Sequence, residues 1–162
     1  MVIFNPETAP YFPLFNRSIE DAGSSFAVKP IATPVHETGD IERAINAIEH
    51  GSNSGLVVVP SAFMTIHREL IFGLAARHRL PAVYGFSYYA RSGGLVSYGI
   101  NVRDMYLRAA SYVDRILRGA KPGDLPVQAP TKFELMINLK TAKAMGLEIS
   151  PMLLARADEV IE

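Results

Sequence analysis

The sequence predicts an α/β fold with an open parallel sheet and helices on both of its faces. Short apolar runs alternate with amphipathic segments along the whole chain, an order that is typical of parallel sheets with right-handed crossovers. The run 55–60 is apolar throughout and is bounded by turn residues, as expected of a strand that is buried on both faces. A length of 162 residues fits a single domain with its own core.

In the first part of the chain, the expected strands are apolar runs and the expected helices end at glycines. Strands are expected at 1–4, 26–32 and 55–60, and helices at 10–22 and 40–49. Gly23 is expected to end the first helix, and Pro30 to interrupt the second strand. The second helix is the clearest, because its isoleucines fall at helical spacing and Gly51 follows it.

The second part of the chain continues the alternation. Strands are expected at 80–84, 95–98 and 133–137, and helices at 62–78, 101–118, 139–145 and 150–161. Ser61 and Asn101 stand where helix N-caps are expected, and Gly119 stands where a helix should end. The pair Ser150-Pro151 predicts the start of the final helix. The helix 101–118 carries most of its apolar side chains on one face.

Composition excludes several classes of site and partner. Lys+Arg and Asp+Glu both number 16, so no basic excess indicates a nucleic acid or an anionic membrane as partner. The absence of cysteine excludes disulfides, thiolate metal sites and cysteine nucleophiles. The N-terminus lacks the pattern of an export signal, and no apolar run is long enough to insert into a membrane. A chain complete as written is therefore expected in the cytoplasm.

Motifs of catalytic, cofactor and metal sites are absent. The sequence contains no GxGxxG after the first strand, no GxxxxGK[ST] and no GxSxG. The histidines His36, His50, His67 and His78 form no i, i+4 pair, and His67 has the best functional claim because it lies soon after a strand. Glu7, Asp40 and Asp104 are interpreted as acids at helix N-termini. We therefore expect no catalytic residue, no metal ligand and no cofactor.

The residues that follow the strands are aromatic or neutral and polar. In an open parallel sheet, ligands bind outside the carboxyl ends of the strands. The candidate ligand-binding residues are Asn5, Thr8, Ser61, Phe63, Tyr88 and Tyr98. Aromatic faces with hydroxyl and amide groups suit a small organic ligand. The alternative is structural: Tyr84, Phe86, Tyr88 and Tyr89 pack beneath helices, and Ser61 and Asn101 act only as N-caps.

The chain resembles the substrate-binding proteins of ABC transporters, including the tryptophan- and tyrosine-type proteins. The stretches that carry the resemblance are 57–63 (VVVPSAF), 74–84 (LAARHRLPAVY), 92–99 (SGGLVSYG), 109–119 (AASYVDRILRG) and 124–146 (DLPVQAPTKFELMINLKTAKAMG). The resemblance implies the type I periplasmic-binding-protein fold, whose lobes are three-layer α/β domains like those of flavodoxin and Rossmann proteins. In this fold two such lobes close around a ligand, and the closed protein is presented to a membrane permease.

By this resemblance, residues 1–162 are a single domain that corresponds to the second lobe, and 95–119 resemble the segment that crosses to a first lobe. The first lobe and the export signal are expected to be missing from the sequence as written. The implied function is the partial solute-binding component of an ABC importer, with an amino acid or related organic acid as ligand. The resemblance implies ABC permease subunits as partners and a periplasmic location.

Two other functions remain possible at this point. The chain could be an enzyme of a flavodoxin- or racemase-like α/β class, or a cytosolic ligand-sensing lobe that acts through a partner protein.

Without a first lobe, the apolar face of the helix over 102–117 has nothing to cover it. We therefore expect a homodimer or an exchange of this segment between two copies.

Overall fold

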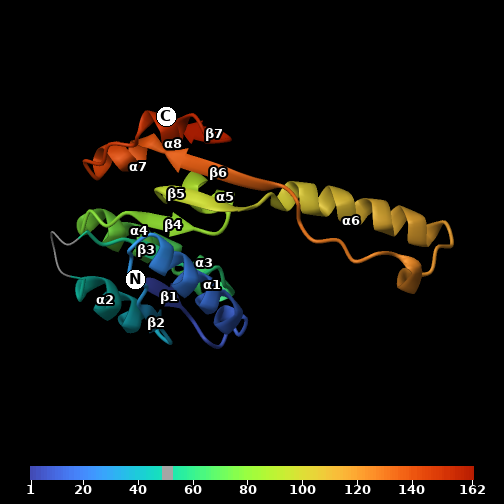
Figure 1. Ribbon diagram of the computed structural model, residues 1–162, viewed down its shortest axis with the longest axis horizontal. Helices are drawn as coiled ribbons and strands as arrows, with labels where there is room; N and C mark the ends of the chain where they lie inside the picture. The colour runs from blue at the N-terminus through green and yellow to red at the C-terminus, as the bar shows by residue number, and fades with distance from the viewer. Residues whose placement is uncertain (49–52) are drawn as a thin grey trace.

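The computed structural model describes residues 1–48 and 53–162, and their strands form one seven-stranded sheet (Figure 1). The strands are β1 (Val2–Phe4), β2 (Ala32–Pro34), β3 (Leu56–Val58), β4 (Ala82–Tyr84), β5 (Val96–Ile100), β6 (Phe133–Asn138) and β7 (Glu159–Ile161). Their order across the sheet is β2-β1-β3-β4-β5-β6-β7. Strands β1 to β5 are mutually parallel, which confirms the predicted α/β sheet. Strand β6 pairs antiparallel with β5, and β7 runs parallel to β6.

Helices lie on both faces of the sheet. They are α1 (Phe12–Ser25), α2 (Thr38–Asn46), α3 (Ala62–Ile66), α4 (Arg68–Arg77), α5 (Ser87–Arg91), α6 (Val102–Leu117), α7 (Leu139–Ala144) and α8 (Pro151–Leu154), with a 3-10 turn at Pro122–Asp124. No helix within 1–48 or 53–162 combines the length and the apolar character needed to cross a membrane. The expected helix end at Glu49, the glycine stop at Gly51, and His50 lie outside the described residues.

The expected boundary between the first helix and the second strand was wrong. Helix α1 passes through Gly23 and ends at Ser25, and β2 begins only at Ala32. A Cβ on Gly23 would lie 2.6 Å from the Cδ of Pro30, so this glycine lets the returning chain pack closely against the helix rather than ending it. The chain reverses at Ala27, whose φ is 52°.

Two further expectations about helices were wrong. The helix expected over 62–78 is divided at His67 into α3 and α4. The final helix, expected to reach about Ile161, ends at Leu154, and the chain then forms β7. Strand β7 pairs with β6, and these hydrogen bonds take the place of those that a longer helix would make. The Asp158 carboxylate also accepts a hydrogen bond from Leu135 N at 2.8 Å. Helix α5, which follows β4, was not expected at all.

The main core fills the space between the sheet and helices α2 to α5. Its fully buried side chains include Ile3, Ile41, Ile45, Leu56, Met64, Ile71, Tyr84 and Tyr89. On the other face, Phe12 of α1 packs with Val2 and Val59, while Ala142 and Met145 pack against Leu95. The sheet is therefore the middle layer of three, as the predicted fold class requires.

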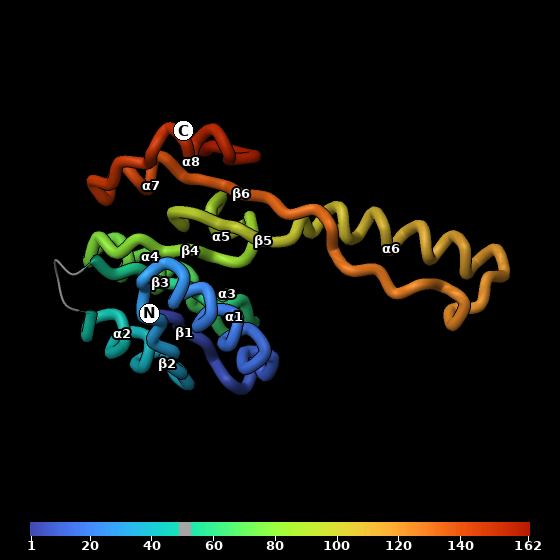
Figure 2. Tube along the Cα trace, viewed as in Figure 1, coloured from blue at the N-terminus to red at the C-terminus, as the bar shows by residue number. Residues whose placement is uncertain are grey.

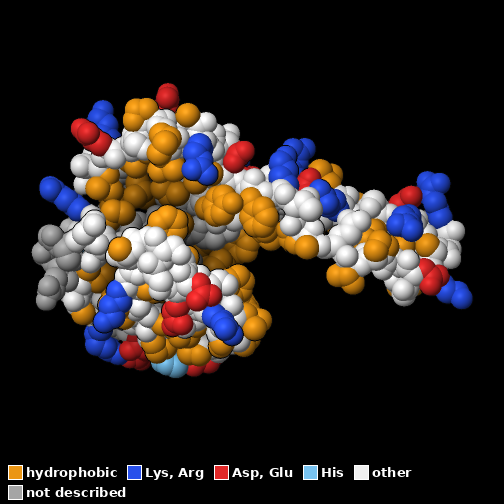
Figure 3. Space-filling model, in the orientation of Figure 1, with side chains coloured by type: hydrophobic (Ala, Val, Ile, Leu, Met, Phe, Trp, Pro, Cys, Tyr) orange, Lys and Arg blue, Asp and Glu red, His pale blue; other side chains and the backbone are white. Residues whose placement is uncertain are grey.

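The second face of the sheet is covered at its two sides and bare in between. Residues Val2, Val57, Val83 and Val96 lie side by side across four strands. Val2 is buried by the cluster that contains Phe12, but Val57 and Val83 are 39% and 40% exposed. In Figure 3 the surface is hollowed between the part of the molecule that carries α1 and the part that carries α7 and α8, and hydrophobic side chains gather in this hollow.

Helix α6 and the segment that follows it form an arm that projects from the body of the molecule (Figures 1 and 2). None of the residues of α6 is buried. The returning segment lies beside the helix, where Arg108 Nη2 donates to Thr131 Oγ1 at 2.7 Å and the Tyr112 hydroxyl donates to Pro126 O. Of the segment 95–119, β5 is thus part of the sheet, whereas the face of α6 that carries Tyr106, Val113 and Leu117 is exposed.

Candidate functional site

The carboxyl ends of β1, β3, β4 and β5 meet at one edge of the sheet, which we call the carboxyl edge. Because β1 to β5 are parallel, the loops that follow them lie on the same side. Strands β6 and β7 run the other way, so their carboxyl ends lie at the opposite edge. Asn5, Thr8, Ser61, Phe63 and Tyr88 belong to the segments that follow these strands, and Tyr98 is the middle residue of β5.

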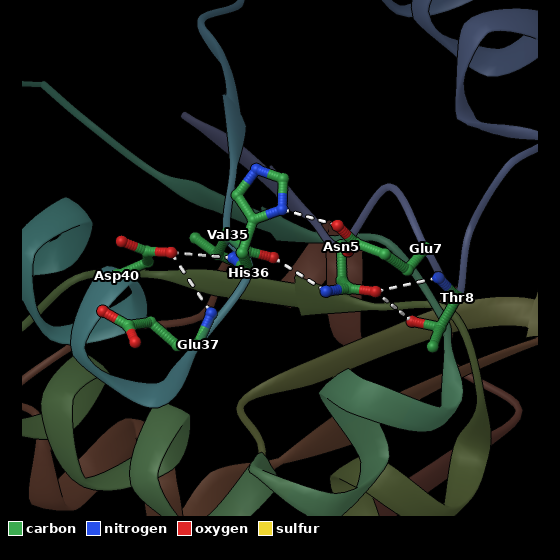
Figure 4. Close-up of polar contacts among 7 residues, drawn as sticks. All are labelled: Asn5, Glu7, Thr8, Val35, His36, Glu37 and Asp40. Atoms are coloured by element: carbon green, nitrogen blue, oxygen red, sulfur yellow. Dashed lines mark hydrogen bonds and ion pairs between the residues drawn. The ribbon is translucent and has the colours of Figure 1, made fainter.

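The loop after β1 is organised around Asn5 (Figure 4). The Asn5 side chain is only 3% exposed, and its Nδ2 donates to Val35 O at 2.9 Å. Its Oδ1 accepts from Thr8 N at 2.8 Å and from Thr8 Oγ1 at 2.6 Å. Asn5 therefore joins the end of β1 to the end of β2 and fixes Thr8, and its amide has little surface to offer a ligand.

The segment after β3 begins helix α3 with a capped turn. Ser61 Oγ accepts a hydrogen bond from Met64 N at 3.2 Å, which confirms the expected N-cap. Thr65 lies one turn later, and its Oγ1 donates to Ser61 O at 2.8 Å. Pro60, at the end of β3, accepts a hydrogen bond from the hydroxyl of Tyr11. Tyr11 thus ties the loop after β1 to the loop after β3.

The segment after β4 adds a cluster of aromatic rings to the carboxyl edge. The ring of Tyr88 stacks on Phe86 at 5.7 Å and on Tyr89 at 4.5 Å between centroids. The hydroxyls of Tyr88 and Tyr89 lie 3.0 and 2.9 Å from Thr65 Oγ1. Burial raises the pKa of Tyr89, and burial also raises the pKa of Tyr11, with a smaller contribution from neighbouring Tyr88. The phenols of Tyr11 and Tyr89 therefore stay neutral at physiological pH.

Phe63 and Tyr98 lie apart from this cluster. The Phe63 ring is half-buried and lies 4.3 Å from the ring of His67. His67 Nδ1 binds Phe63 O at 2.9 Å and its Nε2 lies 3.0 Å from Thr38 Oγ1, so this histidine links α2 to the junction of α3 and α4. Tyr98 is 58% exposed and stacks on Phe133 at 6.1 Å, near the base of the arm.

Comparison with known proteins places this arrangement in a family. A family model described as ABC transporter substrate binding protein matches residues 2–161. The chain belongs to this family. A search of curated proteins finds no significant match to the sequence.

Solved structures share the fold of this family member over its whole length. A conserved domain protein from Vibrio cholerae is 24% identical, with a TM-score of 0.83 over 98% of this chain and 53% of its own. An ABC domain from Streptococcus pneumonia, solved in complex with L-Trp, is 18% identical, with a TM-score of 0.83 over 99% of this chain and 54% of its own. A ligand-free, open substrate-binding protein with adhesive properties from Clostridium difficile is 18% identical, with a TM-score of 0.72 over 99% of this chain and 53% of its own. The chain thus spans about half the length of these proteins.

Some of the residues that link the loops of the carboxyl edge were not among the predicted ligand-binding residues. Tyr11, Thr65 and Tyr89 link the loops after β1, β3 and β4. The spacing of Thr65 four residues after the N-cap Ser61 was a usable signal, because a threonine at that position reaches back to the carbonyl of the cap. Of the four aromatic residues that the structural alternative predicted to pack beneath helices, Tyr84 and Tyr89 are almost fully buried, Phe86 is half-buried and Tyr88 is exposed.

The acidic residues near the carboxyl edge have structural partners. Asp40 is the third residue of α2 and takes part in its capping box, and Asp104 is the third residue of α6, so both are N-terminal acids as expected. The same expectation for Glu7 was wrong, because α1 begins only at Phe12. Glu7 Oε1 instead lies 2.6 Å from His36 Nδ1 (Figure 4). Within 1–48 and 53–162, no three acidic or histidine side chains are grouped as a metal ion would need.

We expect Asp40→Asn to lower the stability of the protein at neutral pH and to make its free energy of unfolding depend less on pH in the acid range. Hydrogen bonds from His36 N, at 2.8 Å, and Glu37 N hold the pKa of Asp40 below its ordinary value. A lowered carboxyl pKa adds stability at pH values above the unfolded pKa of about 4, and this stability is lost as the pH falls through the folded pKa. Urea unfolding at pH 7 and pH 3 should therefore show a difference from the parent that shrinks at pH 3. The exposed Asp21→Asn variant should show no such pH-dependent difference.

Proposed function

We propose that residues 1–162 are the second lobe of the solute-binding component of an ABC importer, which binds a small molecule and catalyses no reaction. The observation that carries the proposal is the carboxyl edge, where neutral hydroxyls and aromatic rings from the loops after β1, β3 and β4 form one hydrogen-bonded group. Such a surface suits an amphiphilic organic molecule better than a phosphate or a metal ion. The related ABC domain that was solved with L-Trp supports an amino acid as the class of ligand.

The arm supports the proposal that a first lobe completes the binding cleft. In the proposed two-lobed protein, α6 and the returning segment up to Lys132 cross to the first lobe. The helix has an unburied apolar stripe of Tyr106, Ala110, Val113 and Leu117, which such a lobe would cover. Closure of the two lobes would then present the protein to permease subunits on the outer side of the cytoplasmic membrane, the location implied for the family.

Ligand binding is tested by adding a panel of amino acids and small carboxylates to isotopically labelled protein and recording amide NMR spectra. We expect shifts at Thr8, Tyr11, Ser61 and Tyr88, and weaker shifts in Tyr88→Ala than in Tyr106→Ala, which removes a similar ring from the arm. NMR detects millimolar affinities, so half of a cleft suffices for the measurement. Shifts that avoid the carboxyl edge, or chemical conversion of a panel member, would contradict the proposal.

We also propose that the chain self-associates through α6. In residues 1–162 the stripe is open to solvent, and a second copy presents the same stripe, so a two-fold dimer buries both. Burying two such side chains contributes about 3–6 kcal/mol per chain as an upper estimate. The variant Val113→Glu/Leu117→Glu is therefore expected to weaken association at least about tenfold.

Sedimentation velocity over a range of concentrations measures this effect. Ser111→Glu/Arg115→Glu places two carboxylates on the opposite face of the same helix and should leave the association unchanged. A parent protein that sediments as a monomer at all concentrations, or equal effects of the two double variants, would refute association through the stripe.

A further inference from the structure

Four hydroxyl groups of the carboxyl edge donate their hydrogens to other protein groups: those of Tyr11, Thr65, Tyr88 and Tyr89. Thr65 Oγ1 lies 2.8 Å from Ser61 O, a carbonyl that can only accept, so its single hydrogen is used there. Its contacts with Tyr88 and Tyr89 must then have the tyrosines as donors. Tyr11 likewise donates to the carbonyl of Pro60. All three phenols thus have no hydrogen left for a ligand.

Thr8 repeats this pattern in the loop after β1. Asn5 Nδ2 donates to Val35 O and Asn5 Oδ1 accepts from Thr8 N, which fixes the orientation of the amide. The Thr8 hydroxyl lies 2.6 Å from the same Oδ1 and must donate to it. Thr8 therefore also presents only lone pairs to a ligand. Ser61 differs, because its Oγ accepts from Met64 N and retains its hydrogen.

The lone pairs of these groups face accessible surface. Tyr11 and Tyr88 are 37% and 38% exposed, and the raised pKa of Tyr11 reflects in part the nearness of Tyr88. An acceptor placed against Tyr11 and Tyr88 would meet only oxygen atoms without a free hydrogen and would lose its hydrogen bonds with water, since only Ser61 among the hydroxyls discussed retains its hydrogen. A donor would find oxygen atoms already oriented to receive it.

The surroundings of Tyr88 leave its hydroxyl, rather than its ring face, as the group that can meet a ligand. The Tyr88 ring is covered by the rings of Phe86 at 5.7 Å and Tyr89 at 4.5 Å. Arg68 lies beside Thr65, where its Nη1 donates to Thr65 O at 3.0 Å, and the Glu69 carboxylate, 3.4 Å from its Nε, partly balances its charge without a hydrogen bond to that nitrogen. An ammonium group placed at Tyr11 and Tyr88 meets hydroxyl oxygens that are oriented to accept its hydrogens.

We propose that the carboxyl edge binds the amine end of its ligand, with Tyr11 and Tyr88 accepting hydrogen bonds from a protonated amine. Thr65 acts as a positioning residue, because it accepts the hydrogen of Tyr88 and so leaves that hydroxyl with lone pairs only. This inference rests on the proposed function and deepens it, since it distinguishes amine-bearing ligands from simple organic acids.

The test compares two probes that share a ring but differ in charge, 2-phenylethylamine and 3-phenylpropanoate, by NMR titration of the full chain at pH 7. We expect the amine to bind at least tenfold more tightly, with shifts at Tyr11 and Tyr88. Tyr88→Phe keeps the ring but removes the acceptor, and Thr65→Val frees the Tyr88 hydrogen, so both should bring the ratio of the two affinities toward one. Thr65→Ser should retain the preference, and so should the control Tyr106→Phe on the arm.

The outcomes separate this inference from the proposed function. Equal or tighter binding of the acid at the carboxyl edge would overturn the inference and leave the solute-binding function standing. A preference that persists in both Tyr88→Phe and Thr65→Val would also overturn it. If neither probe nor L-phenylalanine shifts any resonance of the edge, the proposed function fails together with the inference.

Discussion

Replacing Gly99 by alanine is expected to destabilise the protein by about 3–5 kcal/mol, or to prevent folding. A Cβ on Gly99 would lie 1.9 Å from the carbonyl oxygen of Gly85, far inside any contact distance. The neighbour is backbone and cannot move aside as a flexible side chain would. Gly85 in turn leaves no room, because its own Cβ position lies 2.2 Å from the ring of Pro60. The ends of β3, β4 and β5 are thus held in contact at the carboxyl edge.

A second glycine provides the control for this prediction. Gly73 lies within α4, and a Cβ there would meet no heavy atom within 4 Å. Gly73→Ala should therefore stabilise the protein by about 0.5–1 kcal/mol, because alanine restricts the unfolded chain and favours helix. Urea denaturation followed by circular dichroism measures both variants. A loss below about 1 kcal/mol in Gly99→Ala would show that the strand ends separate easily.

The sequence was most informative where local pattern and tertiary structure agree. The apolar run at 55–60 predicted a strand, and β3 lies in the middle of the parallel strands with helices of the core against one face. The predicted burial of both faces was wrong, because Val57 on the other face is 39% exposed. The N-caps at Ser61 and Asn101 were predicted from residue type alone and are formed, since Asn101 Oδ1 accepts from Asp104 N at 2.8 Å. Such features depend on residues a few positions apart, and the sequence contains them directly.

The wrong predictions concern segments whose structure depends on contacts with residues that are distant in the sequence. Residues 155–161 carry no local signal against a helix, and β7 forms because β6 offers an unpaired edge. Gly23 resembles a helix stop, yet it remains helical because Pro30 packs against it. The carboxyl edge could be placed by topology, but the contacts of Tyr11 with Pro60 and of Tyr88 with Thr65 join loops that are far apart in sequence. Predicting them needs the register of the strands.

Asn5→Ala is expected to lower the free energy of unfolding by about 2–4 kcal/mol. The substitution removes the amide that donates to Val35 O and that accepts hydrogen bonds from the backbone N–H and the hydroxyl of Thr8. Val35 is fully buried, so its carbonyl would lose its side-chain partner where water does not easily replace it. Asn16→Ala, at a half-buried position of α1, removes a hydrogen bond to the exposed side chain of Glu20 and should change stability by less than about 0.5 kcal/mol.

This variant also decides between two roles for Asn5. If the side chain mainly joins β1 to β2, Asn5→Ala should unfold at a lower urea concentration, and any loss of ligand affinity should follow from disorder of Thr8 and Tyr11. If Asn5 contacts the ligand directly, affinity should fall while the unfolding midpoint stays near that of the parent. The three hydrogen bonds to protein groups and an exposure of only 3% favour the first result. The ligand would then meet Thr8 and Tyr11, which Asn5 holds in place from beneath.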